Sequence, residues 1–143
     1  MAKFLTQLVC SPVPGSDDLW ILTDDLVYQS DVLKATVTVK KGFITDFYSI
    51  PWPASMFLPK SEQGDEAAVI HDNLYTQKRF TRALCDKAIA EAMGVCGVSW
   101  IRRSLIYDGL KIGGWYGWNK KSKPEPMDEV VMEDGSPAPP PRP

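Results

Sequence analysis

The residues best suited to chemistry lie in one short segment, His71-Asp72-Asn73-Leu74-Tyr75, which contains the only histidine of the chain. On an α-helix, residues four apart share a face, so His71 and Tyr75 would point the same way and Asp72 would point aside. Imidazole titrates near neutral pH, which makes His71 a candidate general base, and Asp72 is a candidate metal ligand. We therefore predict that any chemistry is centred on His71.

A general base needs a group that orients its ring, and Asp86 is the candidate for that role. It lies in the middle of the next predicted helix, among apolar neighbours. A buried carboxylate must accept hydrogen bonds, and His71 and Tyr75 are the expected donors. The predicted catalytic residues are thus His71, Asp86 and Tyr75. A purely structural role stays open, with His71 as a satisfied core or surface residue and Tyr75 as a core aromatic.

A second polar cluster lies in residues 42–51, at the end of a predicted strand. In one interpretation, Asp46 lies beside Asp72 and the two carboxylates bind a hard divalent cation such as calcium. In the alternative, Asp46 and its hydroxyl neighbours cap the following turn. A nucleophilic role for Ser49, with His71 as its base, is less favoured because the Gly-x-Ser-x-Gly elbow is missing.

The elements that must position these residues begin with a β-rich first third. Branched and aromatic residues between polar turns predict strands at 19–22, 26–28, 35–39 and 43–44. Asp24-Asp25 is expected to close a hairpin, and the 35–39 strand is expected to show one face to a core and the other to water.

The second half is predicted to be helical. Apolar spacing predicts a helix over 65–77, a second that Thr81 caps and that runs to Met93, and a third from Ser99. Gly113-Gly114 is expected to end or bend the third helix, whose buried candidates are Ile101, Leu105, Leu110 and Ile112. The predicted fold class is therefore α+β, with a small N-terminal antiparallel β region packed on a C-terminal three-helix region that contains the His-Asp-x-x-Tyr helix pair.

The chain is expected to form one α+β domain over residues 1–119, followed by a Pro-rich tail over residues 120–143. The tail is rich in Lys, Glu, Pro and Ser, so it cannot bury enough apolar surface to fold alone, and we expect it to be flexible or ordered by a partner. A polyproline segment loses little entropy on docking, which makes the tail a candidate contact for other proteins.

Composition argues against several classes of protein. A net charge of -2 gives no basic field, so we expect no nucleic-acid partner. Three cysteines without a metal-binding or paired spacing argue against a disulfide framework and a structural zinc site. We expect no signal peptide and no transmembrane helix, because no cleavage site follows the start and no apolar run approaches the ~20 residues that span a bilayer.

With both motifs in hand, the sequence resembles a phage and prophage family of unknown function. The pattern of that family is Gly-Phe-x-Thr-Asp-Phe-x-Ser-Val/Ile-Pro followed by His-Asp-x-Leu-Tyr, which residues 42–51 and 71–75 match. The resemblance extends over about residues 20 to 115 and includes Arg82, Asp86, Met93 and Tyr107. It implies a bacteriophage protein, located in the virion or in the host cytoplasm.

A more distant resemblance is to the secreted phospholipase A2 enzymes, in which a His-Asp-x-x-Tyr helix packs against a helix with a Cys-Asp-Lys/Arg-Ala pattern. The second pattern corresponds to residues 85–88. The likeness implies that His71 deprotonates a water, that Asp86 orients its ring with help from Tyr75, and that Asp72 holds a calcium ion that polarises an ester carbonyl. The glycine-rich calcium loop and the disulfides of those enzymes are absent from this sequence.

Two functions are expected from these observations. The first is a small hydrolase with His71 as general base, acting on an ester in lipid or cell envelope. The second is a non-enzymatic virion component of the tail or baseplate, with the helix pair as a buttress and the Pro-rich tail contacting other virion proteins. A host-directed inhibitor is a third alternative that the sequence does not separate from these. The aromatic and lysine-rich segment 113–121 is compatible with membrane or envelope contact, or with core packing or a protein interface.

Overall fold

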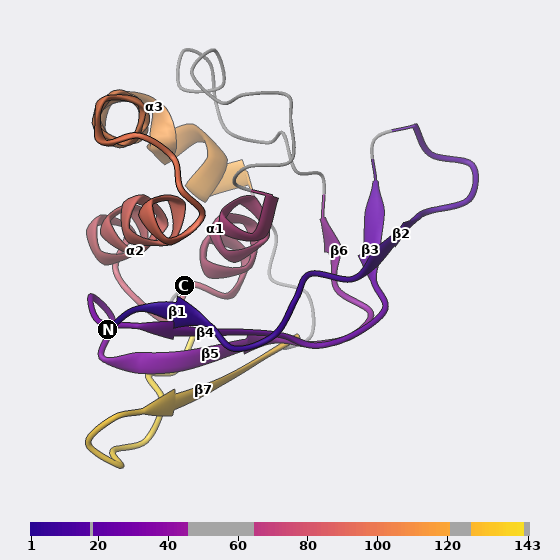
Figure 1. The fold of residues 1–143 in the computed structure, drawn as a ribbon, viewed down its shortest axis with the longest axis horizontal. Coiled ribbons are helices and arrows are strands. Elements are labelled where there is room, and N and C mark those ends of the chain that lie inside the picture. Colours follow the sequence, from indigo (N-terminus) through magenta and orange to yellow (C-terminus); the bar gives the residue numbers. More distant parts are fainter. Residues whose placement is uncertain (18, 46–64, 121–126, 142–143) are drawn as a thin grey trace.

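A computed structural model describes residues 1–17, 19–45, 65–120 and 127–141, with only the backbone described for 114–117 and 120. It shows an α+β arrangement, with antiparallel sheets in the N-terminal half and three helices in the C-terminal half, which confirms the predicted fold class. The helices are α1 (Asp65–Gln77), α2 (Arg82–Val95) and α3 (Trp100–Lys120). In Figure 1, α1 and α2 lie on one face of the larger sheet, and α3 lies beyond them on the side away from the sheet.

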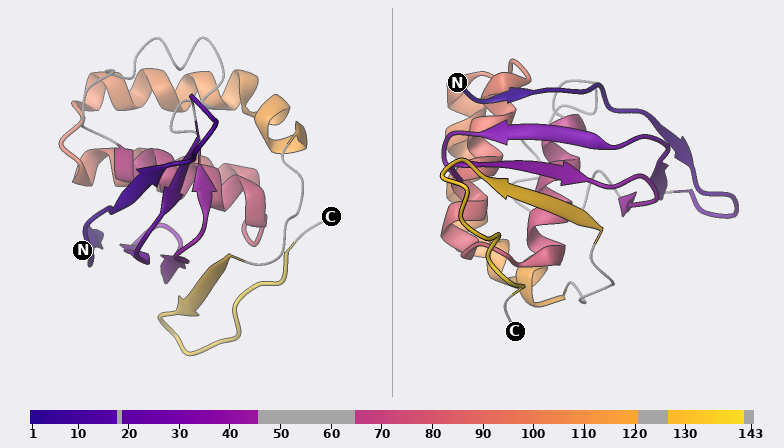
Figure 2. Two further views of the ribbon diagram at one scale, coloured as in Figure 1. Left: turned by 90° about the vertical axis from the view of Figure 1, so that its right-hand side faces the viewer. Right: turned by 90° about the horizontal axis from the view of Figure 1, so that it is seen from below.

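The strands form two separate antiparallel sheets. The larger has the order β1-β4-β5-β7, with the bounds Lys3–Phe4, Leu26–Ser30, Ala35–Val39 and Asp128–Met132. The smaller has the order β2-β3-β6, with the bounds Cys10–Pro12, Trp20–Leu22 and Ile44–Thr45. Figure 2 shows the strands of the larger sheet side by side in front of the helices, with β7 at one edge.

The expected hairpin at Asp24-Asp25 was wrong, because the strands on either side of it, β3 and β4, belong to different sheets. Asp25 instead makes hydrogen bonds in the segment that connects β3 of the smaller sheet to β4 of the larger sheet. Its Oδ1 accepts the backbone N–H of Lys41 at 2.7 Å, and its carbonyl oxygen accepts the Thr6 hydroxyl at 3.1 Å. Lys41 leads into Gly42, whose φ of 95° lies in the region that favours glycine, and the chain then enters β6.

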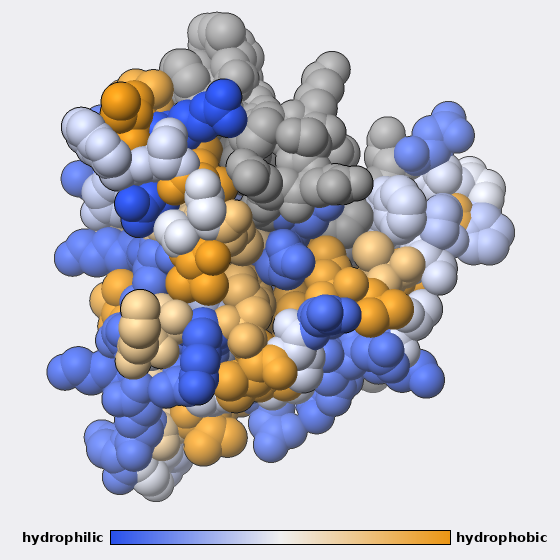
Figure 3. Space-filling view, in the orientation of Figure 1, coloured by the Kyte–Doolittle hydropathy of each residue, from blue (hydrophilic) through white to orange (hydrophobic). Residues whose placement is uncertain are grey.

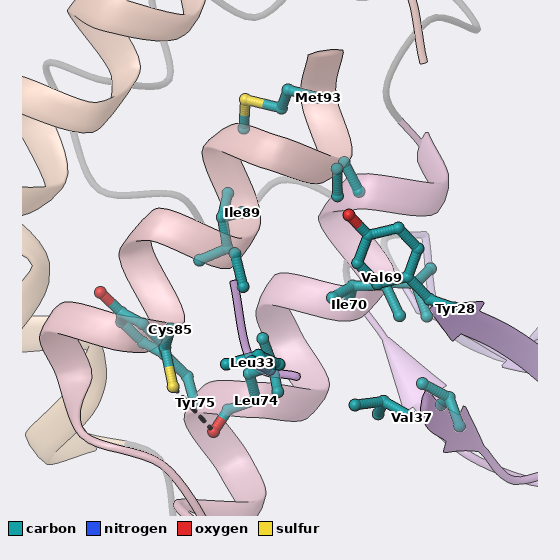
Figure 4. Close-up of a cluster of buried hydrophobic side chains, with 14 of the residues drawn as sticks. Tyr28, Leu33, Val37, Val69, Ile70, Leu74, Tyr75, Cys85, Ile89 and Met93 are labelled. Carbon is teal, nitrogen blue, oxygen red and sulfur yellow. Dashed lines mark hydrogen bonds between the residues drawn. The ribbon is translucent and has the colours of Figure 1, made fainter. Parts of the chain in front are cut away.

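Strands β4 and β5 alternate between buried and half-buried residues, as the sequence predicts for β5. The inward residues of β5 are Ala35, Val37 and Val39, and Tyr28 of β4 lies beside them in the core. Figure 4 shows this layer packed against side chains from α1 and α2, including Val69, Ile70, Leu74, Ile89 and Met93. The core therefore lies between the larger sheet and the first two helices.

One carboxylate fastens α2 to this sheet. Glu91 Oε1 accepts the hydroxyls of Tyr28 and Ser30, each at 2.7 Å, and its Oε2 accepts the Val32 backbone N–H at 3.0 Å. Burial raises the pKa of the Tyr28 hydroxyl, with the nearby Glu91 carboxylate adding to the effect, so Tyr28 remains a donor at neutral pH. These three hydrogen bonds set the position of α2 along the strand.

Helix α2 begins where the sequence predicts, because the Thr81 hydroxyl accepts the Leu84 backbone N–H at 3.3 Å and caps the helix. It continues past Met93 to Val95, so Gly94 lies inside the helix rather than at its end. A Cβ at residue 94 would lie 2.3 Å from a terminal nitrogen of Arg103. Glycine at this position therefore lets the Arg103 side chain of α3 lie directly against α2.

The prediction for the buried face of α3 was largely wrong. Leu110 is buried, but Ile101, Leu105 and Ile112 are exposed, and Ile106, which was not predicted, lies in the core. Gly113-Gly114 does not end the helix, which continues to Lys120. Apolar residues lie on more than one side of this helix, so spacing alone does not identify which side faces the core.

Part of the segment that was expected to be a tail belongs to the larger sheet. Residues 128–132 form β7, which pairs with β5 along its whole length. Val130 and Met132 pack against the core, whereas Val131, on the opposite side of the strand, is 57% exposed. This alternation gives β7 one face that the domain can bury, even though the surrounding segment is too polar to fold alone.

An ion pair holds β7 to the end of α1. Arg79 Nε lies 2.8 Å from Asp128 Oδ2, and the Asp128 side chain is only 2% exposed. A terminal nitrogen of Arg79 also donates to the Pro139 carbonyl oxygen at 3.1 Å. The same arginine thus contacts the first residue of β7 and the polyproline segment that follows.

Substitutions at neighbouring positions of β7 test this packing. Val130→Asn should lower the free energy of unfolding by about 1–2 kcal/mol, because it removes a half-buried apolar side chain from the core. Val131→Asn makes the same chemical change on the exposed side and should cost within about 0.5 kcal/mol. Urea unfolding measures both values, and equal costs would contradict a packed β7.

Candidate functional site

The candidate site is centred on α1, which is enclosed by its neighbours. Every residue from Ala67 to Gln77 is buried, so the helix has no solvent-facing side over this stretch. His71 and Tyr75 share a face as their spacing predicts, with ring centroids 4.3 Å apart and planes inclined by 36°. His71 is 1% exposed and Asp72 is 7% exposed.

The two predicted helices meet at Tyr75 and Asp86. The Tyr75 hydroxyl donates a hydrogen bond to Asp86 Oδ1 of α2, and both side chains are buried. Among the described residues, the hydrogen-bond donor to this carboxylate is Tyr75 rather than His71. The structure therefore brings the three predicted catalytic residues together, with His71 linked to Asp86 through the ring and hydroxyl of Tyr75.

Burial controls the electrostatics of this pair. It raises the pKa of Asp86, while the hydrogen bond from Tyr75 and the positive charge of Arg82 oppose that rise. Burial also raises the pKa of Tyr75, and the hydrogen bond to the Asp86 carboxylate adds to the increase. Tyr75 therefore keeps its proton at neutral pH and can hold Asp86 in place.

Asp72 faces the smaller sheet. Its Oδ2 accepts the hydroxyl of Thr45 at 2.8 Å, and the Thr45 side chain is itself buried at the end of β6. The Thr76 hydroxyl donates to the Asp72 carbonyl oxygen at 2.6 Å. The hydrogen bond between Thr45 and Asp72, two residues 27 positions apart in the sequence, joins the two sequence motifs.

Thr45 is a site residue that the sequence reasoning missed. It precedes Asp46 in the Thr-Asp pair of the first motif, where the sequence indicates Asp46, rather than Thr45, as the candidate ligand. Asp46 and Ser49 lie outside the described residues. The available signal was the alternation of the strand, because Ile44 and Thr45 point to opposite faces and Thr45 is the residue on the buried face.

Of the two predicted cation ligands, Asp72 lies among the described residues and Asp46 does not. Within the described part of the chain, no group of three or more His, Cys, Asp and Glu side chains is arranged to hold a metal ion. Oxygen-rich coordination, which calcium and similar ions need, would thus require ligands from elsewhere. The expectation that Asp72 and Asp46 bind calcium or another divalent cation stays a prediction.

Trp118, in the aromatic segment of α3, lies beside Tyr75. The rings of Trp118 and Tyr75 meet edge to face with centroids 5.2 Å apart. Lys78, which follows α1, places its ammonium group 5.4 Å from the centroid of the Trp118 ring. For Trp118, core packing is therefore the role that the structure shows.

Residues 20–110, more than half of the chain, match the model of a family described as Protein of unknown function (DUF1353). No curated protein matches the chain. No solved structure matches it either.

The raised pKa of Asp86 predicts a specific pH dependence. A carboxyl group whose pKa is higher in the folded state than its ordinary 3.8 stabilises the fold most at low pH, and this contribution is lost as the pH rises through the folded-state pKa. Asp86→Asn removes the titration and retains an acceptor for Tyr75. The variant should therefore gain stability relative to the unmodified protein as the pH rises above about 4.

Urea unfolding over a pH series measures this difference. Asp108→Asn makes the same chemical change at an exposed position of α3 and is the matched control for the substitution itself, with an expected cost within about 0.5 kcal/mol. Tyr75→Phe removes a group that lowers the pKa of Asp86, so it should move the transition to higher pH. A stability difference for Asp86→Asn that falls with rising pH would contradict the assignment.

Proposed function

The chain belongs to this family of unknown function, and from that premise we propose that it is a bacteriophage protein that acts as a small hydrolase with His71 as general base. The observation that carries the proposal is the convergence of both sequence motifs on α1, through the hydrogen bond between Thr45 and Asp72. The likeness of these motifs to a phage and prophage pattern supports the origin. The virion or the host cytoplasm is the proposed location.

The polarity of the enclosed helix supports an active role. Burying a polar or charged group costs free energy unless it is hydrogen-bonded, and an apolar side chain of similar size would pack without that cost. Nevertheless His71, Asp72, Tyr75 and Asp86 all lie in the interior. Buried titratable groups in contact with one another are enriched at functional sites, which favours chemistry here over simple packing.

In the proposed reaction, His71 takes a proton from a water molecule as the water oxygen attacks the carbonyl carbon of an ester. The tetrahedral intermediate then expels the alkoxide, which receives the proton from the imidazolium. Tyr75 positions the imidazole through ring contact, and its own hydroxyl is held by the hydrogen bond to Asp86. The proposed substrates are esters of lipid or cell envelope.

Asp72 has a positioning role in this proposal. The hydroxyl of Thr45 fixes its carboxylate at the junction of α1 and the smaller sheet. If a divalent cation takes part, Asp72 would hold it and the ion would polarise the ester carbonyl. Asp46 is proposed as a further ligand on the basis of its place in the sequence.

The burial of His71 favours a second candidate function. At 1% exposure, the imidazole is reached by a substrate only if neighbouring side chains move. A non-enzymatic component of a phage tail or baseplate would need no such access, and the helix pair would then simply support the helical layer. The polyproline segment after β7 is the proposed contact with other virion proteins.

Activity measurements separate the two functions. The purified full-length protein should release fatty acid from phospholipid vesicles or phenol from aryl esters, assayed with calcium and with a chelator. His71→Ala should lower kcat by about 10²–10⁴, the usual contribution of a general base, while retaining its circular dichroism spectrum. Lys87→Ala, an exposed change beside Asp86 on α2, is the matched control and should leave activity unchanged.

Two results would count against the hydrolase. One is full ester hydrolysis by a folded His71→Ala protein. The other is an unmodified protein without hydrolysis on any of these esters, accompanied by its presence in purified phage particles, which would support the virion component.

A further inference from the structure

The outer side of α3 carries large apolar side chains that the fold leaves exposed. Trp100 is 69% exposed, Ile101 56%, Leu105 40% and Ile112 75%. Ile101, Leu105 and Ile112 follow one another at helical spacing, so they lie along one side of the helix, and Trp100 lies at its start. In Figure 3, apolar and strongly hydrophilic atoms lie next to each other over α3, at the upper left. We call these four residues the α3 apolar strip.

This helix differs in charge from the rest of the molecule. It contains four basic residues and one acidic residue, which gives α3 a net charge of +3. The whole chain has a net charge of -2, so the remaining residues together carry -5. Arg103 lies against Gly94 of α2, and the side chain of Lys120 lies outside the described residues. The exposed charges around the α3 apolar strip are therefore Arg102, Lys111 and Asp108, with a net charge of +1. The partner of this surface should therefore be anionic.

The charge also decides between the occupants of an exposed apolar strip. A second copy of the chain docked through the same strip would bring together two surfaces that each carry a net charge of +1, which is unfavourable. An exposed tryptophan, branched aliphatic side chains and flanking arginine and lysine are instead the composition of helices that lie in an anionic membrane interface. No helix in the described part of the chain is long and apolar enough to cross a membrane, so contact would be with the surface only.

We propose that the α3 apolar strip binds an anionic lipid surface, with the helix lying parallel to the membrane plane. Trp100, Ile101, Leu105 and Ile112 enter the interface, and Arg102 and Lys111 contact lipid phosphates at its edge. Asp108 opposes the attraction. The proposal stands on the exposed side of α3 and is independent of any reaction at His71.

Vesicle flotation with the full-length protein tests the proposal. The probe is vesicles of phosphatidylcholine and phosphatidylglycerol in equal amounts, compared with phosphatidylcholine alone. The unmodified protein should bind the anionic vesicles, and added salt should weaken the binding. Ile112→Asp should abolish the binding, because it places a charge where an apolar side chain enters the interface.

Charge variants of α3 should act in opposite directions. Arg102→Gln should weaken binding roughly fivefold, the effect of losing one basic residue near an anionic surface. Asp108→Asn should strengthen it by a similar factor, because it removes the repulsion. Val131→Asp is the matched control for Ile112→Asp, since Val131 is a comparably exposed aliphatic residue on β7. The Val131→Asp variant should bind the anionic vesicles as well as the unmodified protein does.

Several results would overturn the proposal. They are equal binding to neutral and anionic vesicles, no binding to either, or an equal loss in Ile112→Asp and Val131→Asp. A dimer in solution that Ile112→Asp dissociates, without vesicle binding by the unmodified protein, would assign the strip to a second copy instead. Loss of ester hydrolysis does not enter this test, so the two proposals fail separately.

Discussion

The constraint on which this structure depends is the burial of a polar helix. Helix α1 has neighbours on every side, yet six of its buried residues are polar or titratable, namely His71, Asp72, Asn73, Tyr75, Thr76 and Gln77. Such a helix is stable inside a protein only where surrounding elements supply hydrogen bonds and close contacts. The smaller sheet provides Thr45, α2 provides Asp86, and α3 provides the ring of Trp118. The site and the architecture are thus two aspects of the same packing arrangement.

Helix α2 connects α1 to the larger sheet, because two of its carboxylates accept hydrogen bonds from these two elements. Asp86 binds the Tyr75 hydroxyl of α1, and Glu91, five residues further along, binds the hydroxyls of Tyr28 and Ser30 in β4. Residues five apart on a helix point in clearly different directions, which suits a helix that must contact two neighbours at once. A rotation of α2 that improved one set of hydrogen bonds would break the other, so the orientation of Asp86 toward α1 depends on the sheet.

The parts of the fold that the sequence predicted are those that local chemistry decides. The period-2 alternation of residues 35–39, the Thr81 cap and the helix over 65–77 each follow from neighbours within a few residues. The pairing of β-strands, in contrast, depends on residues that are far apart in the sequence. Asp24-Asp25 has the composition of a hairpin turn, but the strands on its two sides find better partners in separate sheets. The face of α3 was missed for a related reason, because apolar residues on two sides of a helix leave its rotation to the tertiary contacts of Ile106 and Leu110.

The pairing of β5 with β7 also has a consequence for the order of events during protein synthesis. Val37 lies opposite Val130, so the ribosome adds more than ninety residues between these two partners. Until the later strand leaves the exit tunnel, one edge of β5 has open backbone groups, a state that invites pairing with a neighbouring nascent chain. The three helices emerge earlier and can already cover one face of the sheet. The last strand then completes a partly assembled domain, and Arg79 is already in place to receive Asp128.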